Sequence, residues 1–264
     1  MLAGEGFDLS GISVSGLLFA DDIVLISRSA EGLKSLYRLV KMRCDMLLLE
    51  VNTGEGKSEV ISPDDDLWEL LDVNGNVELS LRQVVEYNYL GLETSASIYR
   101  TIMNKRRKCI RVANKYKFAC LHLGTIGADV VDATMATWCN IALPSILFGC
   151  EGIIFNETTI SDLESIQSDI AKSLLGLPSN TVNVCAQTEL GMLPISLILF
   201  KKQLNFYFRV LELPTSRWVK KALMEHLALT WPSPYLKYVT SVRNKVMLFS
   251  FPPTRKYLNV HLRS

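Results

Sequence analysis

The sequence predicts an α+β protein in which the strands come first and the helices follow. Within residues 1–97, apolar runs of strand length and rich in β-branched residues are separated by turn-forming residues. From residue 98 on, apolar residues recur every three or four positions, which is the spacing of amphipathic helices. The charge changes at the same point, because residues 1–99 carry 7 basic and 17 acidic side chains and residues 100–264 carry 21 basic and 10 acidic ones. We therefore expect three parts, covering residues 1–97, 98–211 and a basic, proline-containing tail at 212–264.

The composition favours an intracellular protein, nuclear or cytoplasmic. No run reaches the roughly 18 apolar residues of a membrane span, and the first ten residues lack the basic and apolar regions of a signal peptide. Six cysteines without a Cys-x-x-Cys pair, and only three histidines, are poor material for a zinc site, so free thiols are expected. The chain is 48% hydrophobic with a mean hydropathy of +0.19, which indicates a surface that packs against a partner.

The stretch Ile12–Ser27 predicts a tight hairpin that carries two adjacent carboxylates at its turn. Ile12–Phe19 and Ile23–Ile26 have the length and residue types of buried strands, and only three residues separate them. Aspartate is common in turns, so a solvated turn is one interpretation of Asp21 and Asp22. Two adjacent carboxylates in an apolar hairpin also repel each other and need water, a donor or a cation. A hairpin that holds Mg²⁺, which prefers carboxylate oxygens, is therefore the other interpretation.

The following residues predict one helix and several short elements. Apolar residues at helical spacing after Ser29 indicate an amphipathic helix of about 18 residues, with Ser29 as its N-cap. We expect this helix to lie across the sheet that contains the hairpin. Gly56-Lys57-Ser58 is not a phosphate-binding loop, because the earlier glycine of that motif is replaced by Val51. A helical turn is expected at Leu67–Leu71, and a hairpin turn at Asn74–Gly75.

Within residues 1–97, three stretches carry a resemblance to a known family, and Ile141–Gly149 carries a fourth, similar to a proline-containing stretch that follows the family's palm. Phe19-Ala20-Asp21-Asp22, within its apolar frame, resembles the palm motif of reverse transcriptases in the form found in non-LTR (LINE-type) retrotransposons. Asn52 with Lys57-Ser58 resembles the family's turn whose lysine faces the incoming triphosphate. Tyr89-Leu90-Gly91 resembles the strand of its primer grip. The resemblance spans about residues 11–210 and implies a partial polymerase palm, an antiparallel β-hairpin with a packed helix, followed by a mostly helical thumb.

The resemblance implies RNA-directed DNA polymerase activity with two Mg²⁺ ions. Asp21 would then ligate the catalytic metals with the help of Asp22, and Lys57 would face phosphate as a catalytic residue. Tyr89, Leu90 and Gly91 would position the primer. The implied partners are an RNA template, a DNA primer and a dNTP.

The family also uses a third aspartate on an earlier palm strand and a Gln-Gly-x-x-x-Ser-Pro segment. Nothing before Asp21 resembles either feature. We therefore expect this chain to be inactive alone and to lack an N-terminal palm and fingers that would pack against it.

A basic helix is predicted after Ser97, with no acidic residue between positions 94 and 128. It carries the candidate nucleic-acid-binding residues Lys105, Arg107, Lys108, Arg111 and Lys115. Lys108, Arg111 and Lys115 share one face at helical spacing and could follow a phosphate backbone, as a thumb that holds an RNA–DNA hybrid would. A nuclear localisation signal is a second interpretation of the cluster.

Tyr116 and Phe118 on the same helix either stack on bases or pack in the core. Two functions other than polymerase activity remain open for the whole chain. It could be a non-catalytic nucleic-acid-binding remnant, including a domesticated one, or a helical protein-interaction module. No function is assigned to the tail.

Overall fold

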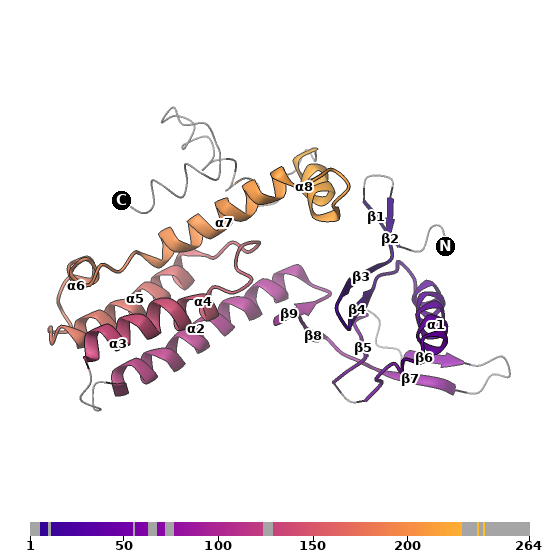
Figure 1. Ribbon diagram of the computed structural model, residues 1–264, viewed down its shortest axis with the longest axis horizontal. Helices are drawn as coiled ribbons and strands as arrows, with labels where there is room; N and C mark the ends of the chain where they lie inside the picture. The colour runs from indigo at the N-terminus through magenta and orange to yellow at the C-terminus, as the bar shows by residue number, and fades with distance from the viewer. Residues whose placement is uncertain are drawn as a thin grey trace. The chain divides into compact units, whose positions relative to one another are not determined.

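The computed structural model describes residues 6–9, 12–54, 56–62, 68–71, 77–123 and 129–228, together with Lys237 and Thr240. The chain divides into two compact units, here called the strand unit (residues 1–89, 94–96 and 214–229) and the helical unit (residues 90–93, 97–213 and 230–264). Among the described residues, every strand precedes α2 and every helix except α1 comes after the last strand (Figure 1). This order is compatible with the predicted α+β class.

The FADD stretch forms a hairpin, as predicted, but the strand that leads into it is interrupted. The strands here are β1 (Phe7–Leu9), β2 (Ile12–Val14), β3 (Gly16–Phe19) and β4 (Asp22–Leu25). β2 pairs antiparallel with β1, whereas β3 pairs antiparallel with β4. The predicted single strand Ile12–Phe19 is therefore wrong. The chain changes its pairing partner at Ser15-Gly16, where glycine lowers the cost of a bend.

The β3–β4 hairpin is also far more exposed than predicted. Leu18 and Phe19 are 74% and 63% exposed, and Leu17 and Ile23 are exposed as well. Within the described residues β3 and β4 form a two-stranded sheet, and such a hairpin has too few neighbours to bury either face.

A three-stranded sheet lies next to the first helix of the strand unit. It consists of β5 (Glu59–Val60), β7 (Val77–Gln83) and β6 (Trp68–Leu71), with β7 in the centre. β5 runs parallel to β7, and β6 runs antiparallel to it. The predicted helical turn at Leu67–Leu71 is thus wrong, because the buried side chains of Trp68 and Leu70 follow the two-residue period of a strand. The predicted Asn74–Gly75 turn lies outside the described residues, between the paired strands β6 and β7.

Helix α1 (Ala30–Met46) confirms the helix predicted after Ser29. The Ser29 hydroxyl accepts a hydrogen bond from the Gly32 amide at 3.0 Å, which satisfies one of the free donors of the first turn. Tyr37 of α1 meets Trp68 edge to face, with ring centroids 6.2 Å apart. These two rings form the core of the strand unit together with Val60, Leu70 and Leu81.

The hairpin formed by β8 (Glu86–Tyr89) and β9 (Leu92–Ser95) joins the two units along the chain. Leu90 and Gly91 form its turn, with φ angles of +49° and +82°. Positive φ at both turn residues is typical of a type I′ turn, which matches the twist of the strands. The predicted primer-grip strand is therefore a strand end followed by a turn.

The helical unit contains a large apolar core. Its elements are α2 (Ile98–Leu123), α3 (Val130–Thr137), the π-helix η1 (Trp138–Ala142), α4 (Leu143–Ile146), α5 (Glu157–Leu174), α6 (Asn183–Glu189) and α7 (Ile195–Glu212). Fully buried side chains include Trp138, Ile146, Leu163, Ile170 and Ile195.

Gln167 is buried within this core and connects two of its segments. Its Oε1 accepts from the Trp138 indole at 3.0 Å, and its Nε2 donates to the Leu193 carbonyl at 3.0 Å. The buried amide is therefore satisfied at both ends.

The last described helix, α8 (Trp218–Ala228), groups with the strand unit and lies against β1. The tail predicted at 212–264 thus contains a helix whose described side chains are exposed or half-buried, and most of the remainder lies outside the described residues. All six cysteines are free, as predicted. Among the helices that the structure describes, none combines the length and apolar composition needed to cross a bilayer.

Candidate functional site

The double aspartate lies at the tip of the β3–β4 hairpin. Phe19 and Asp22 face each other across the strands, so Ala20 and Asp21 form a two-residue turn. Ala20 has a φ of +51°, which costs a residue other than glycine about 1–2 kcal/mol. Positive φ at the first turn position is typical of a type II′ turn. Both carboxylates are exposed at this strained turn.

The pair alone does not match a two-ion centre. Mg²⁺ can be held by one or two carboxylates together with water and substrate phosphates, so Asp21 and Asp22 suit a single ion. Two ions about 3.5–4 Å apart need additional protein ligands. In the part of the chain that the structure describes, no group of three His, Cys, Asp or Glu side chains comes together around such a position.

Tyr87, which was not predicted as a site residue, interacts with two of the predicted catalytic positions, Lys57 and Asp22. The Tyr87 hydroxyl donates to the Lys57 carbonyl oxygen at 2.8 Å. Burial raises the pKa of Tyr87, and the negative charges of Asp22 and Glu59 raise this pKa further. Asp22, the Lys57 turn and Tyr87 thus share one neighbourhood within the strand unit. The only signal in the sequence was that Tyr87 stands two residues before Tyr89, on the same strand face.

The turn that contains Lys57 is closed by several hydrogen bonds. The Asn52 side chain accepts from the Gly54 amide at 3.0 Å, and the Ser58 hydroxyl donates to the Asn52 carbonyl at 2.6 Å. The Lys57 amide closes the turn on the Gly54 carbonyl at 3.0 Å. The Lys57 side chain itself is exposed.

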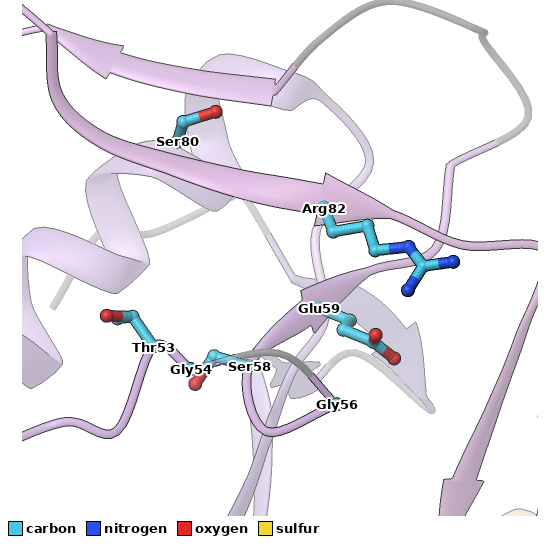
Figure 2. Close-up of a pocket in the computed structure, with 7 residues that line it drawn as sticks. All are labelled: Thr53, Gly54, Gly56, Ser58, Glu59, Ser80 and Arg82. Atoms are coloured by element: carbon cyan, nitrogen blue, oxygen red, sulfur yellow. The ribbon is translucent and has the colours of Figure 1, made fainter.

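A pocket of about 380 Å³ lies between this turn and strands β5 and β7 (Figure 2). Its wall is polar and made up of Thr53, Gly54, Gly56, Ser58, Glu59, Ser80 and Arg82. Figure 2 shows Glu59 and Arg82 extending from neighbouring strands on the same side. Because the lining carries both charges and three hydroxyl groups, it can accept a polar group. Lys57 is not part of the lining.

The basic residues of α2 fall into two sets. Arg107, Arg111 and Lys115 are exposed, and no carboxylate partner is found for them among the described residues. Positions four residues apart on a helix are neighbours on one face and rise about 6 Å per step. These three side chains, called the basic face below, therefore form a row of positive charge.

The other two predicted nucleic-acid contacts turn away from solvent. Lys105 is only 5% exposed and lies one turn before the buried Cys109. Lys108 is half-buried, and its Nζ donates to the Gly91 carbonyl at 2.9 Å. Neither belongs to the basic face.

Phe118 and Tyr116, two of the aromatic residues of α2, also have different environments. Phe118 is 65% exposed and lies on the same side of the helix as Arg107 and Arg111, with its ring centroid 3.9 Å from that of His122. Tyr116 packs against the core of the helical unit, and its hydroxyl lies 3.5 Å from that of Ser145. Of these two rings, Phe118 is thus the one that is available to a ligand.

Comparison with known proteins gives one distant similarity. No protein-family model and no solved structure matches the chain. The chain is 24% identical over 176 residues to a protein of Caenorhabditis elegans whose name describes it as transposon-derived and uncharacterized. The match covers 64% of this chain and 59% of that protein. It links the chain to a transposon-derived sequence.

Proposed function

We propose that the chain derives from the palm and thumb of a non-LTR retrotransposon reverse transcriptase and that it binds an RNA–DNA hybrid along α2. The basic face carries this proposal, since Arg107, Arg111 and Lys115 are exposed and lack a carboxylate partner among the described residues. The similarity to a transposon-derived protein and the FADD hairpin support the origin.

The physical chemistry of the basic face suits a nucleic-acid backbone. Cations that contact phosphates release counterions, so binding would be strong at low salt and fall steeply as salt rises. No acidic residue occurs on α2 to oppose this attraction. Phe118 would add a flat ring on which an unpaired base can stack.

We propose that nucleotidyl transfer requires an assembly that adds ligands to Asp21 and Asp22. Mg²⁺ held there would neutralise charge that develops on a transferring phosphoryl group. Lys57 would face the phosphates, and Tyr87 would hold the backbone of the Lys57 turn. Hybrid binding through α2 does not depend on these residues.

Fluorescence anisotropy with a short RNA–DNA hybrid would test the binding proposal. The double charge reversal Arg107→Glu/Arg111→Glu should weaken binding by roughly tenfold or more at low salt. The matched control is Arg209→Glu/Arg217→Glu, which changes the net charge equally at exposed positions off α2 and should have little effect. Hybrid binding that survives the reversal on α2 would refute the proposal.

A primer-extension assay would test the catalytic part. The chain alone should incorporate no dNTP in the presence of Mg²⁺, and Asp21→Asn should leave hybrid binding unchanged. Mg²⁺-dependent incorporation that disappears in Asp21→Asn would show that the chain is a complete enzyme.

A further inference from the structure

The tip of the β8–β9 hairpin is held within the helical unit, although strand β8 belongs to the strand unit. Residues Leu90–Glu93 group with the helices. Lys108 of α2 donates its ammonium hydrogen to the Gly91 carbonyl oxygen at 2.9 Å. This hydrogen bond holds the tip against Lys108, the residue that directly follows Arg107 of the basic face.

Two glycines let the tip approach the turn after α4 closely. A Cβ placed on Gly91 would lie 3.2 Å from Cε1 of Phe148. A Cβ placed on Gly149 would lie 2.9 Å from Cδ2 of Leu92, and Gly149 has a φ of +68°. Phe148 and Gly149 therefore form a socket for the tip, in which a Cβ on Gly149 would displace the Leu92 side chain and one on Gly91 would press on the Phe148 ring.

The tip needs such support because its backbone is strained. Leu90 adopts a left-handed φ of +49°, which residues other than glycine rarely adopt. Conformations of this kind persist where the surroundings hold them. The hydrogen bond from Lys108 fixes the orientation of the Gly91 carbonyl, and thereby the turn.

We propose that Lys108 is a positioning residue that holds the Leu90–Gly91 turn beside the basic face, and that it makes no phosphate contact. Lys108 stands three residues before Arg111, so the tip lies along one edge of that face. The nucleic-acid part of this inference rests on the proposed function, whereas the positioning of the turn does not. The surface offered to a hybrid would then combine the cations of α2 with the exposed Leu90 side chain.

Hydrogen exchange and salt-dependent binding together separate positioning from phosphate contact. In Lys108→Met the amides of residues 89–92 should exchange roughly tenfold faster, while exchange of α5 stays unchanged. Hybrid affinity should fall, but the slope of log K against log salt should not change. The matched control Lys115→Met should flatten this slope by about one and leave the tip unchanged.

Two further variants guard against a general folding defect. Lys108→Arg keeps a long cationic donor and should preserve protection of the tip. Gly149→Ala adds a methyl group that would displace Leu92 and leaves every cation unchanged. It should therefore speed hydrogen exchange at the tip without changing the slope of log K against log salt.

A Lys108→Met variant that flattens the salt slope and leaves the tip protected would overturn the inference and make Lys108 a phosphate contact. Unchanged exchange in Gly149→Ala would equally refute the socket. If the wild-type chain binds no hybrid, the proposed function fails, but the exchange measurements still decide the role of Lys108.

Discussion

The strand unit and the helical unit differ in how much apolar surface each buries. In the helical unit, Trp138, Leu163 and Ile195 are completely buried within one large core. Among its described residues, the strand unit has a core cluster of five side chains and leaves the apolar β3–β4 hairpin exposed. Since burial of apolar surface is the main favourable term in folding, the helical unit should be the more stable of the two. The hairpin that carries the double aspartate belongs to the unit that has least to support it.

Two leucine truncations test this difference most directly. Leu163→Ala should lower the free energy of unfolding by about 3 kcal/mol, because it leaves a cavity in a packed core. Leu18→Ala removes the same atoms from an exposed strand and should cost less than about 0.5 kcal/mol. Urea unfolding followed by circular dichroism measures both. A cost of 2 kcal/mol or more at Leu18 would mean that the hairpin is covered in solution.

Thiol labelling gives a second comparison of the units. Cys109 and Cys150 lie 3.7 Å apart, sulfur to sulfur, in the helical core, and the hydrogen bond from Cys150 lowers the pKa of Cys109. A lower pKa favours the reactive thiolate, but burial excludes the reagent. We therefore expect Cys44 of the strand unit, which is half-buried, to label faster than either. Mass spectrometry of peptides after timed labelling would report the order, with the exposed Cys185 as a fast control.

The smallest expected effect concerns Tyr87, which reports on the position of the hairpin within the strand unit. Its raised pKa favours the neutral phenol, so the associated stability is present below the unfolded value of 10.0 and is lost as the pH rises through the folded value. Asp22→Asn removes one of the negative charges and should bring the pKa of Tyr87 down toward its ordinary value. The phenolate absorbance of each protein, corrected with the matching Tyr87→Phe variant, measures the change. An unchanged pKa would mean that Asp22 lies farther from Tyr87 than described.

Sequence patterns predicted the elements whose signals are local. The Ser29 cap, the amphipathic helix that follows it and the tight hairpin at Asp21 are each set by neighbouring residues, although the turn has two residues rather than the expected three. Trp68–Leu71 was mistaken for a helical turn, because four residues are too few to distinguish a two-residue period from a helical one. The exposure of Leu18 and Phe19 depends on which strands lie next to them, and this is not encoded locally.

The sequence predicted that α2 is basic, but it did not predict which of its basic residues face solvent and which bond within the protein. The five candidate nucleic-acid-binding residues of α2 are all basic, so residue type alone does not show which of them face solvent. Lys105 could have been recognised as inward-facing, because it lies one turn before Cys109 and two turns before Ala113, on the buried line of the helix. The bond from Lys108 to Gly91 joins residues 17 positions apart and leaves no trace in either local pattern.

The π-helix at Trp138–Ala142 has a consequence for insertions and deletions in this chain. Its hydrogen bond runs from the Leu143 amide to the Trp138 carbonyl, so the turn contains one residue more than an α-helical turn. Removing one residue from this turn would restore a regular α-helical turn and keep Ile146 on the same side of the helix as Trp138, because the extra residue is already accommodated in the wider turn. Removing one residue from a regular turn, such as those of α5, would instead rotate everything after it by about 100° and move buried side chains out of the core. The chain should therefore tolerate the loss of one residue better at this π-turn than in a regular turn of a buried helix.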